Sequence, residues 1–163
     1  ADVLKAILDH NLNNSLFAGI ASKSAYESLK ESNEFTLGGT YGGGGPSLKL
    51  KADYVYFKNQ CAVVSLSGAV IIITKLRRPF HYLRDFSDLD LDLKDFKTLF
   101  VKSGYISPDL QSLSAPTFMA LTSGAVNQDL KGIENNHRIQ SLYPFQDFKD
   151  YSPVVSNGEH LVN

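Results

Sequence analysis

Tryptophan is absent from this 163-residue chain, and cysteine and methionine each occur once. With Cys61 as the only thiol, the chain can form no internal disulfide and no cysteine cluster for zinc or iron–sulfur chemistry. A strand-like sequence begins at Cys61, where a small buried hydrophobic residue is the commonest role for cysteine. A single thiol suits a reducing compartment, so we expect a cytoplasmic protein.

Long hydrophobic runs are also missing. The longest strongly apolar stretch, residues 68–74, is far shorter than the roughly 20 residues that a membrane-spanning helix needs. The N-terminus has neither an initiating methionine nor a secretory pattern. We therefore expect no membrane partner, and we expect the chain to be a fragment of a longer two-domain protein.

Neither sign of charge dominates, because 16 Lys and Arg stand against 17 Asp and Glu. Nucleic-acid binding requires clustered cations, so we expect no nucleic-acid partner. The composition, 43% hydrophobic and 20% charged, is that of an ordinary globular domain. These values predict one domain over residues 1–163.

The first third of the chain alternates apolar segments with helix signals. Helical spacing predicts a helix over residues 2–12, and a short apolar run follows at residues 15–20. Ser24 and Glu27 form a capping-box pattern that opens a second helix toward Lys30. Residues 38–46 contain six glycines and one proline, which predicts a loop.

The middle of the chain has the patterns of strands. Apolar and charged residues alternate at the start of residues 48–57, which predicts a single strand there. Residues 61–66 and 69–74 are rich in β-branched residues, and the Ser67-Gly68 pair between them predicts a tight hairpin. Residues 48–74 should therefore form an antiparallel block.

The last third predicts short elements joined by polar segments. In chain order they are a helix near residues 81–86, a strand at 97–101, a helix from Ser107-Pro108 to residue 113, a strand at 117–121 and an extended tail at 146–163. The whole pattern predicts a single compact α/β domain with a mixed sheet, an antiparallel β-block and a few short helices.

The glycine stretch is the first candidate for ligand contacts, through Gly38, Gly39, Gly44 and Gly45. Consecutive backbone amides in such a turn can form an anion-binding nest. The stretch lacks the lysine and hydroxyl of a P-loop and the third glycine of a dinucleotide motif. A structural turn and a ligand-gripping loop both stay open.

Metal ligands do not gather in any familiar motif. Asp88, Asp90 and Asp92 copy the first half of an EF-hand loop, but leucines stand at loop positions six and twelve. This favours a solvated acidic surface with leucines turned inward. The four histidines form no zinc-binding pattern. We expect no metal site in this chain.

Lys102 and Ser103 follow the predicted strand at residues 97–101. Ligands collect at the carboxyl ends of strands in α/β sheets. Lys102 would meet an anionic group there, and the Ser103 hydroxyl would exchange a hydrogen bond with a ligand. The alternative is a turn that only terminates the strand.

A series of short motifs follows one order along nearly the whole chain. They are Phe17-Ala18-Gly19-Ile20, Leu37-Gly38-Gly39, Gly44-Gly45-Pro46, Val101-Lys102-Ser103, the segment from Ala120 to Ala125, Gln128-Asp129-Leu130 and Tyr143-Pro144. Their order resembles the C-terminal domain of MlrC-type metallohydrolases. That family is named for degradation of the cyclic peptide microcystin, and its members are regarded as metal-dependent hydrolases with zinc as the ion.

The resemblance implies that the metal ligands lie in a larger N-terminal domain, which would be this domain's partner. It further implies zinc in the full-length protein, no cofactor in this segment, and a small peptide or amide substrate. Gly38, Gly39, Lys102, Ser103 and Gly124 match the family and carry over as interdomain or substrate-facing positions.

Two departures reduce what the resemblance transfers. Ile106-Ser107 stands where many members have a His-Phe pair, and residues 140–146 keep a tyrosine and a proline but lose the charges of the family's closing pattern. The leading hypothesis is a domain that assists substrate binding or closes an active site whose metal is held elsewhere. The alternative is a non-catalytic ligand-binding or homo-oligomerisation module that uses the glycine loop and an exposed strand edge.

Overall fold

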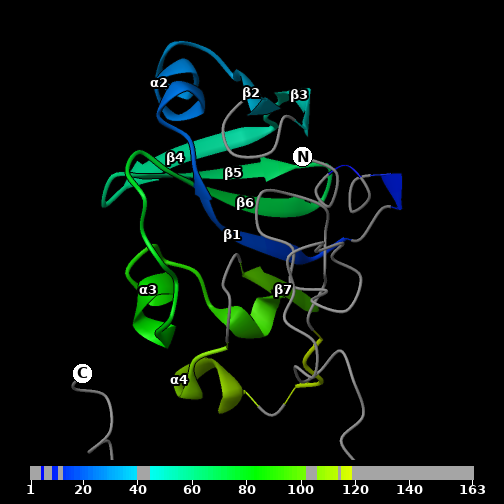
Figure 1. Cartoon of the computed structure of the whole chain (residues 1–163), viewed down its shortest axis with the longest axis vertical. Coiled ribbons are helices and arrows are strands. Elements are labelled where there is room, and N and C mark those ends of the chain that lie inside the picture. Colours follow the sequence, from blue (N-terminus) through cyan, green and yellow to red (C-terminus); the bar gives the residue numbers. More distant parts are fainter. Residues whose placement is uncertain are drawn as a thin grey trace, which may run out of the picture. The chain divides into compact units, whose positions relative to one another are not determined.

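The computed structural model describes residues 13–39, 45–101, 106–113 and 115–118, together with Lys5, Asp9 and His10. A five-stranded sheet has the order β4–β5–β6–β1–β7, and β2 and β3 pair as a separate two-stranded sheet (Figure 1). The strands are β1 (Ser15–Ala21), β2 (Glu34–Gly39), β3 (Gly45–Lys51), β4 (Tyr54–Lys58), β5 (Cys61–Leu66), β6 (Ala69–Thr74) and β7 (Thr98–Val101). The helices are α2 (Lys23–Glu31), α3 (Leu83–Ser87), α4 (Pro108–Gln111) and the 3₁₀ helix η1 (Leu93–Asp95). The mixed α/β prediction is confirmed.

The sheet combines parallel and antiparallel pairing. β1 lies between β6 and β7 and runs parallel to both, whereas β4, β5 and β6 are antiparallel neighbours. The β5–β6 turn is the predicted Ser67-Gly68 pair, and Asn59-Gln60 joins β4 to β5. All four turn residues have positive φ, the geometry whose twist matches that of a two-residue hairpin.

The strand predicted over residues 48–57 is wrong, because two strands in different sheets occupy this segment. β3 pairs with β2, and β4 pairs with β5. Between them, the Ala52 N–H donates to the Asn33 carbonyl at 2.7 Å and the Asp53 N–H donates to the Ser65 carbonyl at 2.9 Å. The side-chain alternation continues into this break, so the sequence pattern carried no signal for the change of sheet.

The loop predicted over residues 38–46 is wrong at both ends. β2 extends to Gly39 and β3 begins at Gly45, and these two residues pair with each other. Hairpin pairing includes Gly39 and Gly45 in the strands, and Gly38, where the register shifts, takes the φ of +85° that glycine tolerates. Gly44 lies outside the described residues.

The second predicted helix is confirmed, but its cap is not. The N-cap is Ser22, whose Oγ accepts a hydrogen bond from the Ala25 N–H at 3.2 Å. Ser24 and Glu27 therefore lie inside α2 and do not open it. Three later predictions are confirmed by α3, β7 and α4, the last with Ser107 as its N-cap and proline in its first turn.

The strand predicted over residues 117–121 is wrong in the part that can be compared. Thr117 and Phe118 have no strand structure, and the Phe118 side chain is 90% exposed. The remainder of that segment, most of the helix predicted over residues 2–12, and the tail at 146–163 lie outside the described residues.

The sheet buries apolar side chains on both faces. On one face, α2 and the β2–β3 hairpin cover a cluster that we call the α2 core. Its most buried members are Ala25, Leu29, Ala62, Val64, Ile71 and Ile73. On the other face, α3 and α4 cover the α3 core, whose most buried members are Leu16, Ala18, Cys61, Val63, Ile72, Phe80, Phe86 and Leu89.

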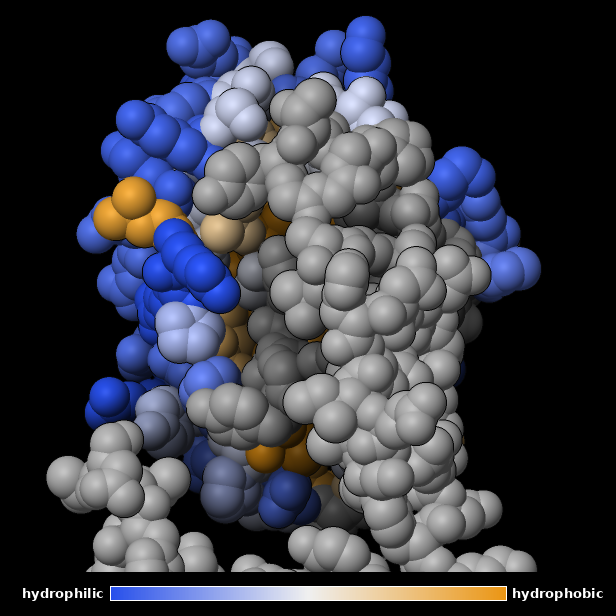
Figure 2. Space-filling view, viewed as in Figure 1, coloured by the Kyte–Doolittle hydropathy of each residue, from blue (hydrophilic) through white to orange (hydrophobic). Residues whose placement is uncertain are grey.

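The described surface in the view of Figure 2 is mainly hydrophilic, with small hydrophobic areas at its left margin and near its centre and lower centre. Within the described residues, no helix is long and apolar enough to cross a membrane.

Candidate functional site

The parallel strands β1, β6 and β7 end at the same edge of the sheet. The connection that follows β1 leads to α2 on one face, and the connections that follow β6 and β7 lead to α3 and α4 on the other. The end of β1 is therefore a topological switch point, and ligands of open α/β sheets bind outside such points. We call this edge the carboxyl edge. Its described residues are Ser22, Lys23 and Ser24 after β1, and Lys75, Leu76 and Arg77 after β6.

The end of β1 is shaped by an irregularity and a cap. Gly19 has a φ of +89°, and the register between β1 and β6 shifts between Phe17 and Ile20. Ser22 then anchors the turn, because its N–H donates to the Thr74 carbonyl at 3.1 Å. The first turn of α2, which carries the partial positive charge of a helix N-terminus, therefore begins at this edge.

The segment after β6 adds cations to the same edge. The Lys75 N–H donates to the Gln60 carbonyl at 3.0 Å, and the Lys75 Nζ lies 3.1 Å from a Glu27 carboxylate oxygen. The next two side chains, Leu76 and Arg77, are exposed. The carboxyl edge thus carries positive charge from Arg77 and Lys23, for which no ion pair is found within the described residues.

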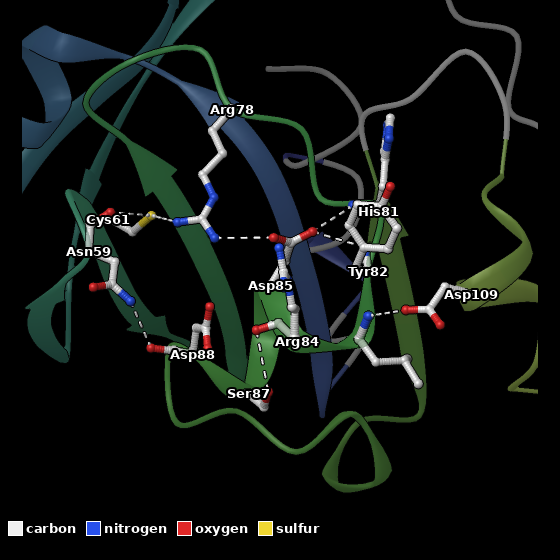
Figure 3. A network of polar contacts seen from close by, with 11 residues as sticks. Asn59, Cys61, Arg78, His81, Tyr82, Arg84, Asp85, Ser87, Asp88 and Asp109 are labelled. Atoms are coloured by element: carbon white, nitrogen blue, oxygen red, sulfur yellow. Dashed lines mark hydrogen bonds and ion pairs between the residues drawn. The ribbon is translucent and has the colours of Figure 1, made fainter.

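A polar network holds the crossover from β6 to α3 (Figure 3). The Arg78 guanidinium lies between two side chains, 3.2 Å from an Asp85 carboxylate oxygen and 3.9 Å from the Cys61 sulfur. The other Asp85 oxygen accepts the backbone N–H groups of His81 at 3.0 Å and Tyr82 at 2.9 Å. One carboxylate therefore pairs with Arg78 and caps the start of α3.

The network shifts two pKa values in opposite directions. Burial raises the pKa of Asp85, but the N–H groups of Tyr82 and His81 and the Arg78 guanidinium outweigh it, so that the pKa is lowered. Burial raises the pKa of the Cys61 thiol, and Arg78 opposes this only in part. Cys61 is 1% exposed and stays a neutral thiol, which confirms its predicted structural role.

Aspartates in the acidic run around α3 form an ion pair and a helix cap. Asp90 pairs with Lys58 at 2.7 Å, and Asp92 accepts the Lys94 N–H at 3.0 Å as the cap of η1. Leu89, which precedes Asp90, is fully buried, and Leu91 between the two aspartates is half-buried, in agreement with the predicted inward leucines. Among the residues that the structure describes, no group of three His, Cys, Asp or Glu side chains could hold a metal ion.

The predicted site residues fall in different places. Gly38, Gly39 and Gly45 belong to the β2–β3 hairpin and not to the five-stranded sheet. Lys102, Ser103, Gly44 and Gly124 lie outside the described residues. The ligand contacts predicted for these seven residues therefore stay predictions.

Sequence reasoning missed the end of β1 and the basic segment after β6. Two signals were available for them. An isolated glycine inside a strand pattern, as at Gly19, indicates a bulge. Lys75 follows a strand directly, as Lys102 does, so the criterion that selected Lys102 also applied to Lys75.

A mixed open sheet with helices on both faces and a switch point at β1 defines an α/β domain of the kind that binds ligands at its carboxyl edge. The family described as MlrC C-terminus matches residues 1–137. This chain therefore belongs to the MlrC C-terminus family.

Among solved structures, the chain is similar to a protein of Mesorhizobium sp. BNC1 described as a "Putative metallopeptidase". The identity is 15% and the TM-score is 0.57, and the match covers 93% of this chain and 35% of that one. At this identity the likeness establishes the fold. The chain spans about a third of the length of that protein. A comparison with curated proteins gave no match.

Proposed function

We propose that this chain is the C-terminal domain of a metal-dependent amide hydrolase and that its carboxyl edge faces the substrate. The switch point at the end of β1 is the observation that carries the proposal, because open α/β sheets in general bind ligands outside such points. Two findings support a hydrolase. The chain belongs to the MlrC C-terminus family, and the structurally similar protein, described as a "Putative metallopeptidase", is much longer.

In this proposal the chain binds and orients substrate but does not hold the metal. A larger N-terminal domain supplies the zinc ligands, and a zinc ion there would provide an activated water. Lys102 and Ser103 follow β7 directly in the sequence and would bind an anionic group and a hydrogen-bonding group of a small peptide. Lys75 and Arg77 would add positive charge, and Gly38, Gly39 and Gly124 remain substrate-facing or interdomain candidates. The buried, neutral thiol of Cys61 fits the cytoplasmic location that we propose.

Substrate affinity in the longer parent protein tests the carboxyl edge. Lys102→Ala should weaken peptide binding roughly tenfold, the loss expected for one charge-assisted hydrogen bond. Lys97→Ala is the matched control, because Lys97 is exposed and precedes β7 at the opposite edge. Equal effects of the two changes would show that the substrate does not lie at the carboxyl edge.

Zinc stoichiometry tests which domain of the parent protein holds the metal. The 163-residue chain should bind no zinc stoichiometrically, whereas the longer parent protein should bind it tightly. Tight, stoichiometric binding by the 163-residue chain would place the metal site here and contradict the proposal.

A further inference from the structure

The strand β4 is an edge strand whose outward backbone groups can be assigned. Lys58 and Cys61 pair across the two-residue Asn59-Gln60 turn, and the register then continues without a shift to Tyr54 and Ser65. Such a turn is closed by a hydrogen-bonded pair, and bonded and non-bonded pairs alternate along antiparallel strands. The backbone groups of residues 54, 56 and 58 therefore point to β5, and those of Val55 and Phe57 point outward. In the part of the chain that the structure describes, β4 pairs with β5 alone.

This edge has few of the features that keep exposed edges from pairing. Proteins protect such edges with prolines, bulges or charged side chains, lysine in particular. The β4 segment contains no proline, and its register with β5 is regular. Its one charge, Lys58, is paired with Asp90 at 2.7 Å. Beside the edge, Tyr54 is 61% exposed and Phe57 is 38% exposed. A strand with this composition is suited to pairing with another strand.

A second copy of the same strand fits the edge. Antiparallel pairing centred on Tyr56 places Val55 opposite Phe57 of the other copy, and both residues have outward N–H and C=O groups. The two Tyr56 residues then form the close, non-bonded pair, in which aromatic side chains stabilise cross-strand contact. The Tyr54 ring lies opposite the Lys58 ammonium of the other copy, a favourable cation–π pairing. The net charge of -1 produces little repulsion between copies.

We propose that two copies of this chain associate through antiparallel pairing of their β4 strands, which joins the two sheets into one. The pairing is two-fold symmetric, as in most homodimers. It does not depend on the proposed hydrolase role, because it uses β4 and not the carboxyl edge.

Sedimentation of the 163-residue chain at concentrations up to about 100 μM tests the pairing, since that range detects even weak dimers. We expect a reversible dimer. Val55→Pro removes an outward N–H donor from each copy and leaves the bonds to β5 intact, so it should raise the dissociation constant roughly tenfold or more. Tyr54→Lys, which places a cation against Lys58 of the other copy, should weaken the dimer as well.

Leu76→Lys is the control for unspecific association, because Leu76 is 63% exposed, like Tyr54, but lies outside β4. It should leave the dissociation constant unchanged. Should Val55→Pro fail to give the native far-UV spectrum, Tyr54→Lys decides, because it changes only an exposed side chain. A monomer at all concentrations, or a dimer that Tyr54→Lys does not weaken, would overturn the proposal.

Discussion

The two faces of the sheet are covered in different ways. The α2 core is closed by a nine-residue helix and a hairpin with strands of six and seven residues. The α3 core is closed by helical segments of five, three and four residues. Such short helices cannot satisfy their own backbone groups, because the first four N–H and last four C=O groups of a helix lack internal partners.

Polar side chains supply the missing partners on the α3 face. Asp85, Asp92 and Ser107 each cap a short helix. Asp109 accepts the Leu83 N–H at 2.6 Å, and Ser107 also donates to the His81 carbonyl, so that α3 and α4 are joined to each other. The difference shows that apolar periodicity is enough to place long elements, whereas short ones depend on specific polar contacts between distant residues.

Phe86→Ala tests whether the α3 core is as strongly coupled to the fold as the α2 core. Phe86 is fully buried and its ring centre lies 5.3 Å from that of Phe80. Removing the ring should lower the free energy of unfolding by about 3–5 kcal/mol, comparable to about 2–5 kcal/mol for Leu29→Ala in the α2 core. Urea unfolding measures both. A loss below about 1 kcal/mol for Phe86→Ala would show that the α3 face is not part of the cooperative unit.

Asp85→Asn tests the polar contacts that hold the α3 face. The variant keeps the shape of the side chain but loses the charge that binds Arg78 and the two N–H groups. It should destabilise the fold by about 1.5–3 kcal/mol, the range for hydrogen bonds to a charged group. Asp88→Asn is the control, because the Asp88 side chain is exposed, and it should change stability by less than about 0.5 kcal/mol.

The Asp85→Asn and Asp88→Asn variants should also differ in how their stability depends on pH. Because the pKa of folded Asp85 is lowered, its contribution is fully present above the ordinary carboxyl pKa of about 4. The contribution is lost as the pH falls through the lower, folded pKa. Stability of Asp85→Asn measured from neutral to acidic pH should lack this part of the decline, and Asp88→Asn should retain it.

Ser22→Ala tests the α2 face, where one cap serves a regular helix. The change removes the Oγ that accepts the Ala25 N–H and should destabilise the fold by about 1 kcal/mol in thermal or urea unfolding. Ser28→Ala, at an exposed position inside α2, should be neutral or slightly stabilising because alanine favours helix. If the two variants behave alike, Ser22 is not the cap in solution.

Asp90→Asn should have the smallest effect. Asp90 pairs with Lys58, but its side chain is 70% exposed, and asparagine tolerates the positive φ of 61° at this position. We expect a loss of about 0.2–1 kcal/mol that disappears at high salt. A larger, salt-independent loss would mean that exposed and buried aspartates contribute alike to the α3 face.

The candidate site was predictable where a strand end could be seen in the sequence. Lys102 was selected because it follows an apolar strand, and β7 confirms that strand. Gly19 was a local signal for a bulge in β1, but it could not select Ser22 as a site residue, because a switch point exists only once β1 is known to lie between β6 and β7. These pairings join residues separated by more than 50 positions, and no local pattern records them.

By itself, the amino-acid sequence determined the fold class, the β5–β6 hairpin, α2 and the structural role of Cys61. Each depends on composition, on the local period of apolar residues or on a turn with a defined backbone geometry. Only the tertiary structure decided that residues 48–57 divide between two sheets, that Ser22 and not Ser24 caps α2, and that Asp85 holds Arg78. In these cases several local arrangements are close in energy, and contacts with residues distant in the sequence select one of them.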